Sequence, residues 1–199
     1  RSEVPALRKR PGEFLGGRSP ALAVKLADDQ AVLALAAVLK AIATAGWQER
    51  SFADWGVLAA PRYLARVLTA STLERFARLG PRGVSPLAIP QTMLSAVSGT
   101  LSVALGAQGI NFGAGGAPGQ LSDALLVGLT MTQAGLAAGL WVVLTEWATE
   151  PVPDQQGDTK TETVGRALAL ACVPAGHAES RFTLRLRRSV AEGAPRETQ

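Results

Sequence analysis

Residues 94–147 read LSAVSGTLSVALGAQGINFGAGGAPGQLSDALLVGLTMTQAGLAAGLWVVLTEW, and this stretch decides the fold. Most of it belongs to a run of sixty-three residues, Gly83 to Thr145, in which Asp123 is the only charged residue. The chain has 199 residues, of which 47% are apolar and 18% charged. This length and composition allow one domain to bury a core, and they exclude disorder in the body of the chain.

The uncharged segment from Ala124 to Thr145 has the length of a membrane-spanning helix. Its glycines and threonines divide it into a helical part, 121–132, and a β-branched run, 140–145, that ends at Glu146. A short apolar run of the second kind is typical of a strand in a sheet that helices cover on both faces. The sequence therefore favours a buried α/β core, with a membrane segment as the alternative.

Capping residues and periodicity predict the order of elements. Asp28 and Asp29 favour a helix start and Gly46 a helix end. The predicted helices cover 28–45, 62–79, 93–105 and 121–132, and the predicted strands cover 55–60, 109–116, 140–145, 165–173 and 181–187, the last two as a hairpin. The second helix is amphipathic, 80–90 is an irregular connection and 149–163 a flexible loop. We expect one α/β domain over residues 21–188, between a basic loop at 1–20 and a disordered tail at 189–199.

Cysteine and histidine counts exclude several kinds of site. A single cysteine, Cys172, excludes an internal disulfide and a cysteine-based zinc site, and a single histidine, His177, excludes a multi-histidine metal centre within this chain. Cys172 lies in an apolar run and is expected to be an inert core residue, and His177 a solvated turn residue. We expect no metal and no cofactor.

The net charge of +4 comes from the two ends of the chain, because residues 1–18 and 181–199 each carry five basic and two acidic groups. The arginines of 181–187 alternate with apolar residues and have no interleaved aromatics on their face, so we interpret them as a solvated strand edge rather than a nucleic-acid surface. No apolar run follows the basic head, so no secretory signal is visible and we expect a cytoplasmic protein.

The turn GAGGAPG at Gly113 to Gly119 invites comparison with phosphate-binding loops. Its spacing differs from G-x-G-x-x-G, because Pro118 stands where the last glycine is required, and no lysine follows as in a P-loop. A tight turn that lets a helix pack closely on the sheet is the favoured interpretation. Asp123, five residues beyond Pro118, suits the first turns of a helix, where the helix dipole stabilises a carboxylate, and facing a partner or a cavity is its alternative role.

An ordered series of segments resembles the N-terminal half of β-ketoacyl synthases, which have a thiolase-like fold. The series comprises LALAAVLKAIATAGW (33–47), GPRGVSP (80–86), LAIPQTM (87–93), the small-residue helix, turn and glycine-rich strand of 94–119, the helix and strand of 124–151, and ALALAC (167–172). The resemblance covers roughly residues 22–187 and rests on order and spacing rather than on one motif. It implies a thiolase-like half-fold with a mixed sheet covered by helices.

The resemblance also implies what this chain lacks. In active synthases a cysteine at the turn before the helix attacks an acyl thioester, and here that position holds Pro118, preceded by Ala117. The two active-site histidines of the family lie in its C-terminal half, and His177 matches neither. The pattern is most similar to the cysteine-less chain-length factors, which pair with an active synthase.

Such a subunit would support an active β-ketoacyl synthase and an acyl carrier protein in fatty-acid or polyketide-type biosynthesis, and a homodimer is a further possibility. The implied subunit interface comprises Asn111, Phe112, Gly113, Gly115, Gly116, Gly119 and Asp123. Half of a split synthase, and a membrane or scaffold protein unrelated to acyl chemistry, remain the alternatives.

Overall fold

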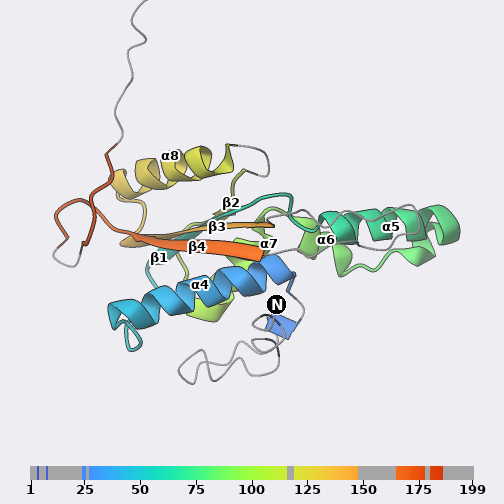
Figure 1. The fold of residues 1–199 in the computed structure, drawn as a ribbon, viewed down its shortest axis with the longest axis horizontal. Coiled ribbons are helices and arrows are strands. Elements are labelled where there is room, and N and C mark those ends of the chain that lie inside the picture. Colours follow the sequence, from blue (N-terminus) through green and yellow to red (C-terminus); the bar gives the residue numbers. More distant parts are fainter. Residues whose placement is uncertain are drawn as a thin grey trace, which may run out of the picture.

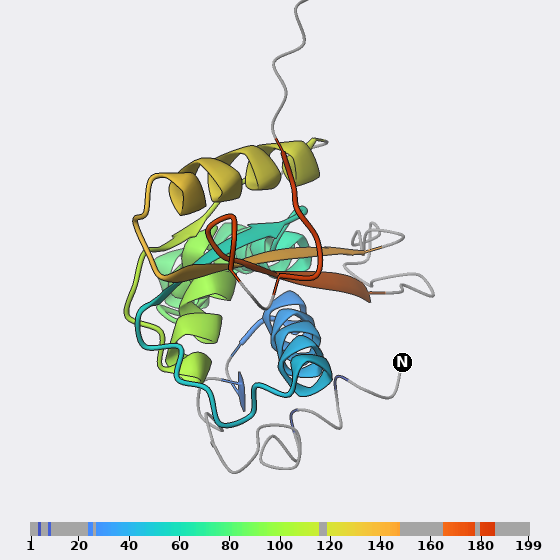
Figure 2. The ribbon, with the colours of Figure 1, turned by 90° about the vertical axis from the view of Figure 1, so that its left-hand side faces the viewer.

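The computed structural model describes Val4, Arg8 and residues 24–25, 27–115, 119–147, 165–177 and 180–185. A four-stranded sheet forms the middle layer (Figures 1 and 2). Helix α8 (Gln120–Gln133) covers one face, and helices α4 (Asp29–Ala45) and α7 (Ser95–Leu105) cover the other. A sheet between two helical layers confirms the α/β class predicted from the sequence.

The strand order is β2-β1-β3-β4, with β1 at Trp55–Pro61, β2 at Asn111–Gly113, β3 at Gly139–Trp147 and β4 at Gly165–Cys172. Strand β1 pairs in parallel with both β2 and β3, whereas β4 runs antiparallel to β3. All seven residues of β1 are buried. Their sequence is continuously apolar rather than alternating because helices cover both faces of the sheet.

Helix α4 follows the sequence prediction closely. The Asp28 side chain accepts a hydrogen bond from the backbone N–H of Gln30 at 2.8 Å, and Gly46 ends the helix with a left-handed φ of 73°. Both ends are therefore set by the capping residues that the sequence indicates.

The uncharged segment 124–145 is divided between a helix and a strand. Residues 120–133 form α8, and β3 begins at Gly139, so the interpretation as a helix followed by a strand is confirmed. Among the residues that the structure describes, no helix has both the length and the apolar character that crossing a membrane requires.

Two apolar clusters hold the layers together. The larger lies between the sheet and the α4–α7 layer, and the smaller lies between the sheet and α8. Helix α8 rests on the sheet through a buried stripe that repeats every four residues, Gln120, Ala124, Gly128 and Thr132, of which Ala124 and Gly128 are small. Small residues on that face let the helix axis lie close to the strands.

The predicted helix over 62–79 is corrected at its start, and the structure adds that this helix is not buried. Helix α5 begins only at Arg66 and ends at Leu79, because Tyr63 and Ala65 have left-handed φ values of 51° and 54°. The sequence predicts an amphipathic helix, and the structure shows that none of its residues is buried. Figure 1 shows the reason, since α5 projects away from the layered body.

The connection predicted to be irregular is largely helical. It contains a 3₁₀ turn, η1 (Gly80–Gly83), and a short helix, α6 (Ala88–Thr92). Pro81 and Pro90 lie within the first turn of η1 and of α6, which is compatible with this because residues of the first turn need no backbone donor.

The predicted hairpin partner of β4 is wrong over residues 181–185, which form no strand and are exposed. Phe182 is 88% exposed. Arg181 instead donates to the carbonyl of Thr44 at the C-terminal end of α4, where the helix dipole favours a cation. Alternation along this segment indicates which side chains share a face, but not which surface they contact.

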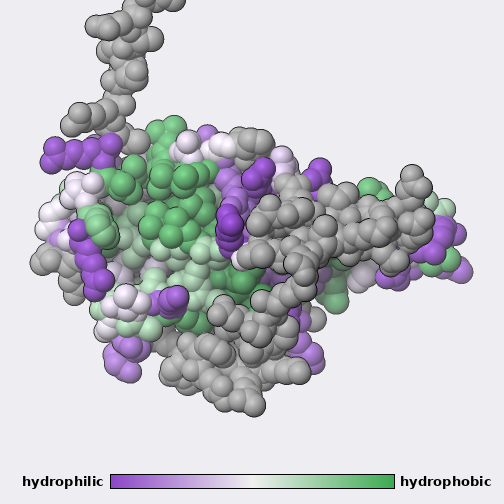
Figure 3. Space-filling model, viewed as in Figure 1, coloured by the Kyte–Doolittle hydropathy of each residue, from purple (hydrophilic) through white to green (hydrophobic). Residues whose placement is uncertain are grey.

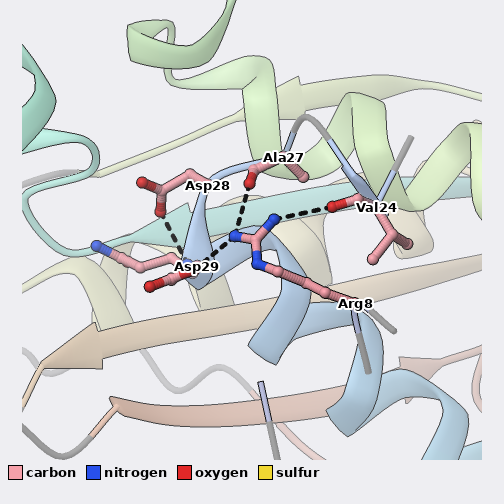
Figure 4. Close-up of polar contacts among 6 residues, drawn as sticks. Arg8, Val24, Ala27, Asp28 and Asp29 are labelled. Carbon is pink, nitrogen blue, oxygen red and sulfur yellow. Dashed lines mark hydrogen bonds and ion pairs between the residues drawn. The ribbon is translucent and has the colours of Figure 1, made fainter. Parts of the chain in front are cut away.

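The basic lead contacts the start of α4 through Arg8 (Figure 4). Its guanidinium donates to the carbonyls of Val24 and Ala27 at 3.0 and 2.9 Å and pairs with Asp29. Val4 and Arg8 lie in helical turns, which differs from the loop predicted there. The predicted loop at 149–163 and tail at 189–199 lie outside the described residues.

Candidate functional site

The predicted site lies where β2 leads into α8, at the carboxyl end of the parallel strands. Gly113 pairs with Ala59 of β1, and the N–H of Ala114 donates to the Ala59 carbonyl at 2.8 Å. Gly119 then caps α8 with a φ of 99°. Gly116, Ala117 and Pro118, between these two points, lie outside the described residues.

Strand β2 lies very close to the start of α7. A Cβ atom placed on Gly113 would overlap the main-chain carbonyl of Leu94. A larger residue would therefore push the small-residue helix away from the strand. This approach of two main chains explains why residue 113 is a glycine.

Asp123 lies in the first turn of α8 and is exposed, and its N–H donates to the carbonyl of Gly119 at 3.2 Å. The expected position of Asp123 at a helix start is confirmed. Asp123 is also one of the residues of the implied interface, and its side chain is exposed there.

The outer edge of β2 has no strand beside it among the described residues. Asn111 on this edge is exposed, while Phe112 and Gly113 are half-buried. Leu94, whose main chain lies against Gly113, is also exposed, and so are its neighbour Met93 and Leu121 in the first turn of α8. The implied interface residues that the structure describes therefore belong to an accessible and partly apolar surface.

A buried polar cluster that the sequence analysis missed joins all three layers at this end of the sheet. The Thr145 hydroxyl donates to Gln30 Oε1 at 2.7 Å, and Gln30 Nε2 donates to the Arg62 carbonyl at 3.2 Å. From the other face, Gln120 Nε2 donates to the Thr145 carbonyl at 3.4 Å. The sequence signal for this cluster was a glutamine in the first turn of α4 and another in the first turn of α8. The hydrogen-bond partners of both glutamines lie far away along the chain.

The carboxylate of Glu146 lies between two arginines. Its oxygens are 3.6 Å from Arg62 Nη1 and 3.9 Å from Arg166 Nη1. These ion pairs connect the ends of β1, β3 and β4.

No three histidine, cysteine, aspartate or glutamate side chains gather into a possible metal site in the part of the chain that is described.

Cys172 and His177 lie away from the start of α8. Cys172 pairs with Leu140 near the beginning of β3, whereas Gly113 is level with Ala59 and Val143, about 10 Å further along the strand direction. Burial raises the pKa of the Cys172 thiol, so its reactive thiolate form is disfavoured. His177 lies in a turn after β4, with its N–H directed to the Pro174 carbonyl.

The structure is similar to a solved one titled "The ishigamide ketosynthase/chain length factor". The two share 19% sequence identity and a TM-score of 0.50, over 68% of this chain and 37% of the other. This similarity shows the fold, and our chain spans little more than a third of that structure. No curated protein matches the chain in sequence.

The family model described as β-ketoacyl synthase, N-terminal domain, matches residues 14–117. The match covers more than half of the chain and ends at the residue before Pro118. Fold and sequence agree that this is a thiolase-like half-fold. The chain belongs to the β-ketoacyl synthase N-terminal domain family.

Proposed function

We propose that this chain is a non-catalytic synthase-like subunit of the chain-length-factor type, which supports an active β-ketoacyl synthase in fatty-acid or polyketide-type biosynthesis. One observation carries the proposal. The position that the resemblance assigns to the attacking cysteine holds Pro118, in the segment between β2 and α8. Proline offers neither a thiol nor a hydroxyl, so it cannot form an acyl-enzyme bond.

The single cysteine of the chain, Cys172, is not placed to act as a relocated nucleophile. Cys172 pairs with the opposite end of β3, and burial raises its pKa. A catalytic cysteine instead needs a lowered pKa, as a helix N-terminus or a neighbouring cation provides. On this proposal the thioester chemistry belongs to a partner subunit that carries its own cysteine and histidines.

The accessible edge of β2 supports such a partnership. A strand edge with free N–H and C=O groups can extend its sheet with a strand from another chain. In the proposed heterodimer, the implied interface from Asn111 to Asp123 faces the synthase, which acts in the cytoplasm with an acyl carrier protein.

The test is co-expression with a cysteine-containing β-ketoacyl synthase encoded beside this chain. We expect the two to co-purify and the length of the acyl product to change when this chain is omitted. We also expect Pro118→Cys to restore no condensation by the chain alone, because the family histidines are absent. Failure to co-purify, together with an unchanged product, would rule out the proposed role.

The alternative role is half of a split synthase, whose remaining lobe is a second chain. The same co-expression distinguishes the two. A split synthase predicts a partner that lacks its own N-terminal half and is inactive without this chain. A chain-length-factor role predicts a full-length partner with its own cysteine.

A further inference from the structure

Several large apolar side chains are exposed on a projection that we call the arm, residues 66–92. The arm consists of α5, η1 and α6, which pack on one another and, through α6, on α7. It extends from the layered body beyond the carboxyl end of β1 (Figure 1). Nothing in α5 is buried, so its own fold does not account for its apolar side chains.

Large apolar side chains are concentrated on the arm and at its base. The exposed ones are Leu73, Phe76, Leu79, Leu87, Ile89, Met93 and Leu94. Leu73 and Ile89 are each 63% exposed. Leu73 and Phe76 are three residues apart and share one side of α5. Exposed large apolar side chains gathered in one part of a protein mark a candidate interaction site.

The base of the arm is continuous with the proposed interface. The arm joins α7 through Met93 and Leu94, and the Leu94 main chain lies against Gly113 of β2. A protein that pairs with the β2 edge would therefore meet the arm as well.

The charge of the arm favours a partner surface that is acidic. Residues 66–92 carry four arginines and one acidic residue, Glu74. Arg75, Arg78 and Arg82 are exposed, and Figure 3 shows hydrophilic and hydrophobic side chains together at the outer end of the arm. Two copies of such an arm would repel each other, whereas an acidic surface around an apolar groove would attract it.

We propose that the arm docks into an apolar groove, bordered by aspartate and glutamate side chains, on the β-ketoacyl synthase subunit. This inference rests on the proposed function and adds the surface by which the synthase is held. The apolar side chains supply the contact area, and the arginines supply orientation and selectivity against a second copy of this chain.

The test compares affinities of full-length variants for that synthase by isothermal titration calorimetry. Leu73→Asp/Phe76→Asp places two carboxylates in the contact, and we expect the Kd to rise at least about tenfold. Leu136→Asp is the matched control, because Leu136 is 55% exposed and precedes β3, at the opposite end of the sheet from the arm. We expect it to bind as the wild type does.

A second variant tests the charge argument separately. Arg75→Glu/Arg78→Glu should weaken binding most at low salt, with the difference shrinking as ionic strength rises. All substituted side chains are exposed, so circular dichroism and melting temperature should match the wild type.

The outcomes separate the two proposals. If the wild type forms no complex, the proposed function fails and the arm inference fails with it. If the wild type binds and the Leu73→Asp/Phe76→Asp variant binds equally well, the arm inference alone is overturned. It is also overturned if light scattering shows a homodimer of this chain that the same variant converts to a monomer, because the occupant is then a second copy.

Discussion

Gly113 shows at the scale of one residue why the strand before α8 is built from glycines. A Cβ atom at this position would overlap the Leu94 carbonyl, and main chain cannot move aside as a flexible side chain does. We expect Gly113→Ala to lower the free energy of unfolding by about 1–3 kcal/mol, the usual cost of overpacking. Equilibrium unfolding in denaturant measures this change in the free energy of unfolding.

Gly99 provides the matched control for that substitution. It lies within α7, and a Cβ atom there would meet nothing within 4 Å. Alanine is the better helix former, so Gly99→Ala should raise the free energy of unfolding by about 0.5–1 kcal/mol. If both substitutions changed the stability equally, the contact with Leu94 would not be the cause.

A second prediction at this scale concerns Asp28. Its helix-capping hydrogen bond and its burial shift the pKa of its carboxyl in opposite directions. Burial is the main cause that raises the pKa of its carboxyl above 3.8, although the hydrogen bond from the Gln30 N–H opposes this. The folded state therefore binds the proton more tightly than the unfolded state. Stability contributed by this group is complete below pH 3.8 and is lost as the pH rises through the raised pKa.

The variant Asp28→Asn separates the two effects. Asparagine keeps a capping oxygen but has no charge to bury. We expect the variant to gain stability relative to the wild type as the pH rises from 3 to 7, measured by denaturant unfolding at both values. A constant difference across this range would contradict the assigned cause.

At the scale of elements, the polar cluster around Thr145 links α4, β3 and the loop after β1. Gln30 and Thr145 are both buried, and the Thr145 hydroxyl donates to Gln30 Oε1. Thr145→Val leaves that buried oxygen without its donor, so we expect a loss of about 1–3 kcal/mol in unfolding free energy.

A double-mutant cycle isolates the hydrogen bond. Gln30→Met/Thr145→Val should cost clearly less than the sum of the two single substitutions, because neither partner of the Thr145–Gln30 bond is then left unsatisfied. Loss of the bond to the Arg62 carbonyl is common to the Gln30→Met single and double variants, so it cancels in the cycle. Strictly additive losses would show that the two side chains do not interact.

The elements also show which features a sequence can predict. The bounds of α4 and the course of β3 followed from capping residues and a short apolar run, which are local signals. The exposure of α5 and the unpaired state of 181–185 could not be predicted, because periodicity identifies an apolar face without identifying what covers it. The Gln30–Thr145 contact was missed for a related reason, since 115 residues separate its partners.

At the scale of the whole molecule, burial is unevenly distributed. The sheet and α4 share the larger apolar cluster, α8 rests on a smaller one, and α5 contributes no buried residue at all. The free energy of local opening should follow the same order, because segments with few buried contacts open most easily.

Hydrogen exchange followed by mass spectrometry tests this order. In the isolated chain we expect the amides of α5 to exchange fastest, those of α8 more slowly, and those of β1, β3 and α4 slowest. When the synthase is bound, α5 should become protected while exchange in α4 stays unchanged. Amides in α5 that exchanged as slowly as those in α4, at every protein concentration, would mean that the arm is already packed within its own chain and has no apolar face to offer a partner.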